Sequence, residues 1–138
     1  MIVNALTIGS ILKGATTYKI EKQLHCGGFG MTYLAKAQIM VGNIPQVAMF
    51  TIKEFFLGKI CSRDVHGNVM VAQENQQLFK QAKQDFRDEA EILHSLKHAN
   101  IVPVNEVFEQ HNTVYYVMAY LGNVSLCQYV SEQGGALS

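Results

Sequence analysis

The chain has 138 residues, of which 49% are hydrophobic and 16% are charged. This composition is typical of one globular domain with its own core, and it excludes a disordered chain. Eleven basic residues balance eleven acidic residues. Because the net charge is zero, the chain has no overall positive field to attract nucleic acid or an anionic membrane, and we expect neither as a partner.

The cysteines also restrict the class of protein. Cys26, Cys61 and Cys127 are odd in number and widely spaced, and no CxxC pair occurs. This pattern argues against a zinc site and against a disulfide framework. No segment approaches the roughly 20 apolar residues that span a bilayer, and residues 1–12 lack the basic start of a signal peptide. The sequence therefore predicts reduced thiols, no metal site and a cytoplasmic location.

The first part of the chain predicts three strands. Residues 18–24 alternate between apolar and polar side chains, and 31–37 and 47–56 are further apolar runs. A glycine cluster at 25–30 separates the first two runs, and turn-forming residues at 41–46 separate the second from the third.

The second part predicts a helix and a hairpin. Residues 75–97 carry an apolar stripe at helical spacing, with Asn75 as a plausible N-cap. The stripe consists of Leu78, Ala82, Phe86, Leu93 and Leu96. Two apolar runs, 101–108 and 114–121, flank a polar turn at 110–113. The chain is therefore predicted to be one α+β domain, residues 1–138, with a five-stranded antiparallel sheet and one main helix.

The glycine cluster lies between two strands. Rossmann and Walker phosphate loops both open a helix, so the position of Gly27, Gly28 and Gly30 argues against them. A glycine-rich hairpin can instead fold over phosphates, because its bare N–H groups approach them closely, and Phe29 would shield that site from water. The other interpretation is a tight hairpin that needs glycine for its backbone angles, and this segment alone leaves both open.

Two charged residues occur where the pattern is apolar. Lys53 lies in the apolar run 47–56, and Glu89 follows Phe86 by three residues on the helix stripe. An inward ammonium needs an anion, and an inward carboxylate needs a cation, so the two residues are candidate partners. Alternatively, Lys53 ends an edge strand and Glu89 lies at the margin of a narrow stripe.

Glycine loop, strand lysine and helix glutamate, in this order, resemble the small lobe of protein kinases. Residues 86–104 are similar to the stretch from helix C to strand four, including an H-x-N-I-V run at 98–102, and residues 114–126 are similar to strand five, the hinge and the start of helix D. The chain is most similar to the bacterial eukaryotic-like serine/threonine kinases, over about residues 11–130. The resemblance implies a kinase N-lobe with a core of about 18–122, followed by the start of helix D and a linker at 123–138.

The resemblance also implies a site for ATP. Lys53 would hold the α- and β-phosphates and Glu89 would orient it, as the two catalytic residues of this lobe. The remaining nucleotide contacts would come from Gly27, Gly28, Phe29, Gly30, Thr32, Thr51, Met118 as gatekeeper, and the backbone of Ala119 and Leu121. Leu93 and Val104 would join the hydrophobic spine, and His98 falls at the family's structural histidine.

Several kinase features are absent from the sequence. No H-R-D, D-F-G or A-P-E motif occurs, and these supply the catalytic base and both magnesium ligands. We therefore expect an inactive ATP-binding lobe of a serine/threonine kinase, truncated before the catalytic lobe, with magnesium bound only if that lobe is supplied. Departures from the family pattern favour the alternative, a non-catalytic, pseudokinase-like interaction module; they are His25, Thr32, Thr51, Ala119 and Asn123–Val124. An unrelated α+β structural domain is a third possibility.

The resemblance implies partners besides ATP. In a complete kinase the larger lobe covers the underside of this lobe. Without it, an apolar cleft face would be uncovered, and we expect it to bind the missing lobe or a second copy of the chain. That face would include Phe29, Leu93, Val104, Met118, Leu121 and Leu126.

Overall fold

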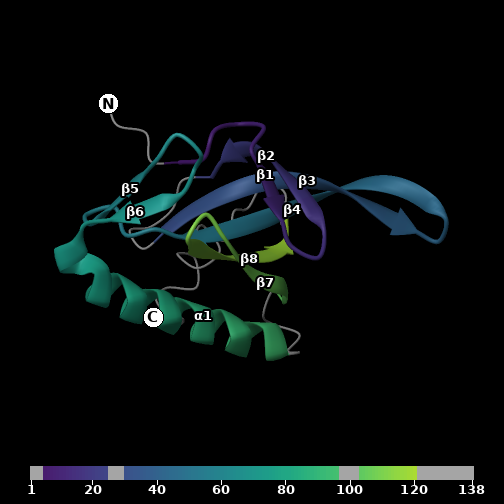
Figure 1. Cartoon of the computed structure of the whole chain (residues 1–138). Coiled ribbons are helices and arrows are strands. Elements are labelled where there is room, and N and C mark those ends of the chain that lie inside the picture. The colour runs from purple at the N-terminus through teal and green to yellow at the C-terminus, as the bar shows by residue number, and fades with distance from the viewer. Residues whose placement is uncertain (1–4, 25–29, 97–102, 121–138) are drawn as a thin grey trace.

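The computed structural model describes residues 5–24, 30–96 and 103–120. Its main sheet is antiparallel and contains six described strands in the order β1-β2-β3-β4-β8-β7 (Figure 1). The strands are β1 (Ile11–Lys13), β2 (Thr17–Gln23), β3 (Gly30–Val41), β4 (Ile44–Phe55), β7 (Val104–Gln110) and β8 (Thr113–Ala119). The predicted α+β architecture is confirmed. The short strand β1, which pairs with β2, is the addition to the five expected strands.

A two-residue turn connects the two strands of each long hairpin, β3–β4 and β7–β8. Gly42 has a φ of 65° and begins the turn between β3 and β4, where glycine adopts a positive φ without steric cost. His111 and Asn112 have φ values of 56° and 61° and form the turn between β7 and β8. Two successive positive φ values give a turn whose twist matches that of the flanking strands. The polar turn expected at 110–113 is confirmed.

The sheet curls until its two outer strands meet. Gln110 on β7 accepts a hydrogen bond from the Lys13 backbone N–H at 2.7 Å and donates one to the Ile11 carbonyl at 3.1 Å. Glu106 on the same strand accepts a hydrogen bond from the Ala15 N–H at 2.8 Å. Side chains thus take the place of the missing strand-to-strand hydrogen bonds and close the sheet around an apolar interior.

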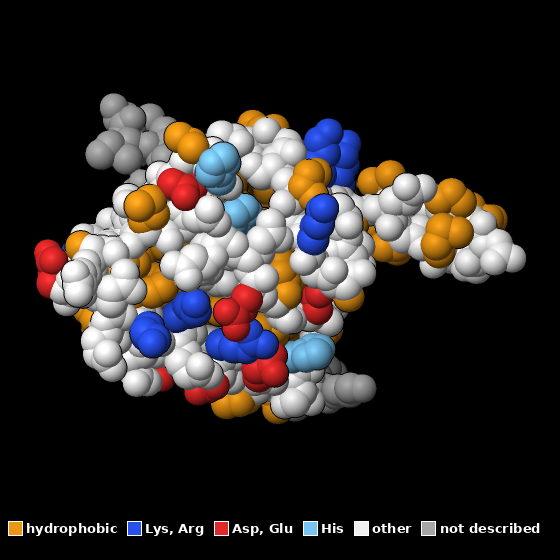
Figure 2. Space-filling view, in the orientation of Figure 1, with side chains coloured by type: hydrophobic (Ala, Val, Ile, Leu, Met, Phe, Trp, Pro, Cys, Tyr) orange, Lys and Arg blue, Asp and Glu red, His pale blue; other side chains and the backbone are white. Residues whose placement is uncertain are grey.

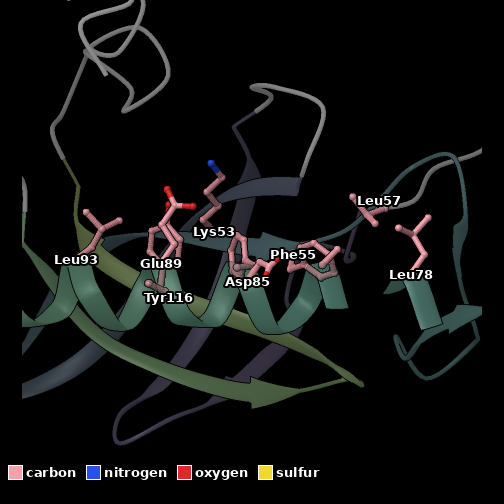
Figure 3. Close-up of a pocket in the computed structure, with 11 residues that line it drawn as sticks. Lys53, Phe55, Leu57, Leu78, Asp85, Glu89, Leu93 and Tyr116 are labelled. Atoms are coloured by element: carbon pink, nitrogen blue, oxygen red, sulfur yellow. The ribbon is translucent and has the colours of Figure 1, made fainter. Parts of the chain in front are cut away.

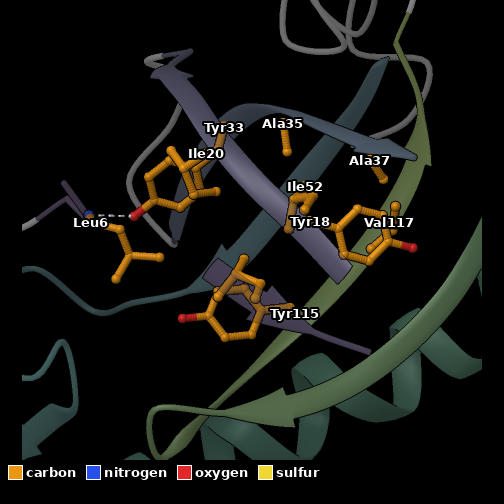
Figure 4. Close-up of a cluster of buried hydrophobic side chains, with 10 residues drawn as sticks. Leu6, Tyr18, Ile20, Tyr33, Ala35, Ala37, Ile52, Tyr115 and Val117 are labelled. Carbon is orange, nitrogen blue, oxygen red and sulfur yellow. Dashed lines mark hydrogen bonds between the residues drawn. The ribbon is translucent and has the colours of Figure 1, made fainter. Parts of the chain in front are cut away.

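Strand alternation assigns each side chain to one of two faces. The interior face carries Leu12, Tyr18, Ile20, Tyr33, Ala35, Ile52, Tyr115 and Val117, all with exposed fractions of 2% or less (Figure 4). On β4, Ile52 and Glu54 point into this interior. Their neighbours Thr51, Lys53 and Phe55 therefore point to the opposite face, along which the helix packs.

Helix α1 (Gln76–Ser95) follows the short 3-10 helix η1 (Gln73–Asn75) and packs against β7 and β8. Its inward face is formed by Phe79, Ala82, Phe86, Ala90 and Leu93, at helical steps of three and four. The predicted stripe was wrong at its ends, because Leu78 is 58% exposed and Leu96 is 39% exposed. Phe79, one position after Leu78, is the buried residue. Asn75 is the N-cap as predicted, although its side chain makes no capping hydrogen bond.

A second, two-stranded sheet lies between β4 and α1 in the chain. It consists of β5 (Cys61–Arg63) and β6 (Val69–Val71), and the sequence patterns did not predict it. The Val69 N–H donates to the carbonyl of His111 at 2.8 Å, and Asn112 Nδ2 donates to the carbonyl of Val69 at 3.1 Å. These bonds fasten the small sheet to the β7–β8 turn. Within the described ranges, none of the helices has the length and apolar character needed to cross a bilayer.

Candidate functional site

A pocket of about 490 Å³ lies between α1 and the adjacent strands β4 and β8 (Figure 3). Lys53 and Phe55 reach it from β4, Tyr116 from β8, and Glu89 and Leu93 from α1. Leu57, Leu78, Ala82, Asp85, Phe86 and Ala90 complete the lining. The pocket therefore brings together the two charged residues that the sequence singled out, in a mostly apolar setting.

The Lys53 ammonium lies in an environment that disfavours its charge. Burial lowers the pKa of Lys53, and the nearby Glu89 carboxylate raises it by a smaller amount. No Lys53–Glu89 ion pair within 4.0 Å occurs among the residues that the structure describes. Lys53 is therefore a partly desolvated cation whose charge is only partly compensated.

Glu89 shares the pocket with Lys53, and in Figure 3 both side chains project to the same side of the helix. Glu89 is exposed, whereas Ala90 beside it is fully buried. Burial and the Glu89 charge together raise the pKa of Tyr116 to about 12. The carboxylate thus lies at the mouth of the pocket, where its field reaches both Lys53 and Tyr116.

Other predicted nucleotide contacts lie on the same face of the sheet as Lys53. Thr32 on β3 is directly opposite Lys53, and Thr51 on β4 is directly opposite Met118 on β8. Thr32, Thr51 and Met118 have exposed fractions of 3% to 4%, whereas Ala119 is exposed. The register thus gathers these side chains beside the lysine.

Position 30 requires glycine for a structural reason. A Cβ atom at this position would lie 2.2 Å from the carbonyl oxygen of Glu54 on the neighbouring strand. Glycine is therefore needed at this position, where the backbone of β4 lies too close for a side chain, whatever else the segment does. Gly27, Gly28 and Phe29 lie outside the described residues, and so do Leu121 and His98.

The expected uncovered face needs a correction. Val104 is 3% exposed and Met118 is 4% exposed, because both pack with Ala90 and Tyr116 beneath α1. The helix covers these two residues, so they do not belong to an open apolar surface. Leu93 is partly buried against the same cluster. Leu126 lies outside the described residues.

The sequence reasoning missed a buried polar network directly behind the lysine. Glu54 is fully buried and accepts hydrogen bonds from Arg63 at 2.7 Å and 3.0 Å. The hydroxyls of Tyr33 and Tyr115 donate to the same carboxylate at 2.8 Å and 2.6 Å. The sequence did contain a signal for this network, because Glu54 lies in the apolar run 47–56. A buried carboxylate there needs a cation for the same reason that Lys53 needs an anion.

Comparisons with known proteins agree with this geometry. Residues 18–138 match the profile of the protein tyrosine and serine/threonine kinase family. Among curated proteins, the chain is 25% identical over 103 residues to an Aurora kinase of Encephalitozoon cuniculi, covering 64% of this chain and 38% of that protein. It is 37% identical over 70 residues to the mouse serine/threonine-protein kinase Nek3, covering 51% of this chain and 14% of the relative.

Two solved structures share the fold. PpkA-294 in its apo form aligns with a TM-score of 0.75 at 20% identity, over 95% of this chain and 44% of that one. The kinase domain of PknI from M. tuberculosis aligns with a TM-score of 0.52 at 20% identity, over 96% of this chain and 42% of that one. The chain thus spans less than half the length of each of these four proteins.

A curled antiparallel sheet that places a lysine opposite a helix glutamate defines the N-terminal lobe of a kinase domain. The chain belongs to the protein tyrosine and serine/threonine kinase family and corresponds to the N-terminal portion of its domain.

Proposed function

We propose that this chain is the nucleotide-binding lobe of a serine/threonine protein kinase and that it binds ATP beside Lys53. The observation that carries this proposal is the state of the Lys53 side chain. Its charge is partly desolvated, and Glu89 lies in the same pocket without an ion pair shorter than 4.0 Å between them. A phosphate anion next to the ammonium would compensate this charge.

Different residues of the chain would contact the phosphates and the adenine ring of ATP. Lys53 would contact phosphate oxygens, and Glu89 would hold the lysine in place from α1. Thr32, Thr51 and Met118 would form the wall against the adenine ring, because they lie on the Lys53 face of the sheet. ATP supplies the transferable phosphoryl group, and the base and magnesium ligands for its transfer would have to come from a C-terminal lobe.

A titration of the whole chain with ATP, followed by calorimetry, tests the proposal. Lys53→Met removes the proposed phosphate contact and keeps a long apolar side chain. The matched control is Lys36→Met on β3, because Lys36 pairs with Glu21 at 3.7 Å and does not line the pocket. We expect saturable binding in the wild type and in Lys36→Met, and at least a roughly tenfold loss in Lys53→Met, since charged hydrogen bonds contribute about 1.5–3 kcal/mol.

The alternative is a pseudokinase-like interaction module that keeps the lobe's shape without nucleotide binding. The Lys53–Glu89 separation beyond 4.0 Å and the threonines at positions 32 and 51 favour it. The same titration separates the two functions. Equal heats for the wild type and Lys53→Met, with no saturation in either, would establish the interaction module and reject the ATP-binding lobe.

The same proposal assigns the lobe a protein partner. The mouth of the pocket, where Glu89 and Leu93 lie, would face a C-terminal kinase lobe or a second copy of the chain. Mixing the chain with a separately produced C-terminal kinase lobe and measuring association by calorimetry tests this part. Loss of the heat signal in Leu93→Asp is expected, and an unchanged signal would contradict the placement of the partner.

A further inference from the structure

The far end of the β3–β4 hairpin projects beyond the body of the molecule (Figures 1 and 2). We call residues 37–49 the distal hairpin. Strand β2 pairs with β3 no further than Lys36, and β8 pairs with β4 no further than Phe50. Over the distal hairpin, each strand therefore pairs only with the other among the described residues, and each has one open edge.

The surface of the distal hairpin is apolar and uncharged. Met40, Val41, Ile44 and Val47 have exposed fractions of 62%, 52%, 62% and 69%. No Lys, Arg, Asp or Glu occurs from residue 37 to residue 52. Figure 2 shows hydrophobic side chains along the projecting arm. An exposed apolar strand without charges is a template for pairing with another strand.

Unlike the distal hairpin, the two outer strands of the main sheet, β1 and β7, are protected from pairing with another strand. Gln110 bridges β7 to the Lys13 N–H and the Ile11 carbonyl of β1. Glu109 on β7 also pairs with Lys83 at 3.8 Å and with Arg87. Side-chain bridges and charges are the usual means of preventing edge pairing, and the distal hairpin has neither.

The two open edges of the distal hairpin are not equivalent. The residues beside a two-residue turn, Val41 and Ile44, bond each other, and hydrogen bonding alternates along antiparallel strands. The backbone groups of Gln38 and Met40 on β3 therefore point outward, as do those of Pro45 and Val47 on β4. Proline lacks an N–H group, so Pro45 blocks part of the β4 edge. The β3 edge has no such block.

We propose that the β3 edge of the distal hairpin, residues 37–41, pairs with the same edge of a second copy of this chain. A two-fold antiparallel arrangement centred on Ile39 places Gln38 opposite the partner's Met40, twice. The outward N–H and C=O groups of these two residues then form four hydrogen bonds. Each side chain meets an uncharged one, so the two-fold axis brings no like charges together.

A second copy is the expected partner because the β3 edge of the distal hairpin is complementary to itself about this two-fold axis. The chain has equal numbers of acidic and basic residues, so copies do not repel at long range. This inference does not depend on nucleotide binding, and it uses a surface remote from the Lys53 pocket.

Sedimentation velocity of the full chain over a wide concentration range tests the proposal. Ile39→Lys places two ammonium groups opposite each other at the two-fold axis. The matched control is Val65→Lys, because Val65 is 94% exposed on the β5–β6 connection and lies outside the distal hairpin. We expect a reversible dimer in the wild type and in Val65→Lys. In Ile39→Lys the affinity of the dimer should fall by roughly tenfold or more. A monomer at every concentration would overturn the proposal.

Two measurements keep the proposal testable if Ile39→Lys does not fold. Residues opposite each other at a non-hydrogen-bonded position have Cα atoms about 4.5 Å apart, which a disulfide can bridge. Ile39→Cys should therefore form a disulfide-linked dimer under oxidation and Val65→Cys should not, in a background with Cys26 and Cys127 replaced by serine. A chain that dimerises while Ile39→Cys remains unlinked would contradict the proposed pairing.

Hydrogen exchange identifies the edge that is used. The amides of Gln38 and Met40 should exchange more slowly as protein concentration rises, whereas the amide of Val47 should not change. Protection of Val47 alone would place the contact on β4 and reject the β3 edge. A dimer that leaves all three amides unprotected and is lost in Leu93→Asp would place self-association at the pocket mouth and also reject it.

Discussion

Lys53 and Glu54 are consecutive residues of β4 whose side chains point to opposite faces of the sheet. Lys53 enters the pocket beneath α1, with its charge only partly compensated. Glu54 enters the closed interior, where Arg63 pairs with it at 2.7 Å and two tyrosine hydroxyls complete its hydrogen bonds. On one face of the strand the charge is therefore fully paired and hydrogen-bonded, and on the other face a cation is available to a ligand.

The Glu54–Arg63 pair should contribute strongly to the free energy of unfolding. Arg63→Ala leaves the fully buried Glu54 carboxylate without its cation, which costs about 3–5 kcal/mol. Arg87→Ala is the matched control, since Arg87 pairs with the exposed residue Glu109 and such surface pairs contribute about 1 kcal/mol or less. Urea unfolding followed by circular dichroism measures both. Equal midpoints for the two variants would show that the buried network is dispensable.

Gly30 should tolerate no side chain. In Gly30→Ala the new methyl group would lie 2.2 Å from the Glu54 carbonyl oxygen, so β3 and β4 would have to separate. We expect a loss of about 1–3 kcal/mol or more, as for other overpacked sites. Gly58→Ala is the control, because a Cβ there meets nothing within 4 Å. Thermal unfolding compares them, and a Gly30→Ala chain as stable as Gly58→Ala would refute the close approach.

Replacing Lys53 should stabilise the unliganded chain. Burial lowers the pKa of Lys53 in the folded state below its ordinary 10.5, so the unfolded state holds this proton more tightly. Stability therefore rises with pH between the lowered pKa and 10.5, and the penalty is largest below that window. Lys53→Met should unfold at a higher temperature than the wild type at neutral pH, with a gain that shrinks as the pH approaches 10.5. A gain that is absent or independent of pH would contradict this.

Much of the fold could be predicted because its signals are local. The alternation in β2, the apolar runs of β3 and β4, and the polar turn before Thr113 each act within a few residues. The Lys53–Glu89 relationship was also predictable, since each charge interrupts an apolar pattern. Both residues line one pocket, as expected, but without an ion pair shorter than 4.0 Å in the described part of the chain.

What the sequence did not predict depends on distant contacts. The strands β5 and β6 have three residues each, too few for a periodic pattern, and β6 is fastened by the remote His111–Asn112 turn. Arg63 pairs with Glu54, which lies nine residues earlier in the chain, so no local sequence pattern marks this contact. Phe79, rather than Leu78, is the buried residue at the start of the helix, although Ala82, Phe86 and Leu93 pack inward as expected. Tertiary packing decides which of two neighbouring apolar residues enters the core.

The chain alone should transfer no phosphate. It contains no H-R-D or D-F-G motif, so the base and magnesium ligands of a kinase are missing from its 138 residues. Incubation with γ-labelled ATP and a generic protein substrate should give no labelled product above a blank without the chain. Labelling that disappears in Lys53→Met but persists in Lys36→Met would overturn this expectation.

The pKa of Lys53, measured with and without ATP, tests the central claim most directly. Carbon-13 labelling of lysine side chains permits an NMR titration, and the signal absent from Lys53→Arg identifies the residue. Without nucleotide, the pKa should lie below 10.5, as its burial dictates. With saturating ATP it should rise, because a phosphate beside the ammonium favours the charged form. An unchanged pKa at ATP concentrations that saturate binding would show that Lys53 does not hold the phosphates and would contradict the proposed function.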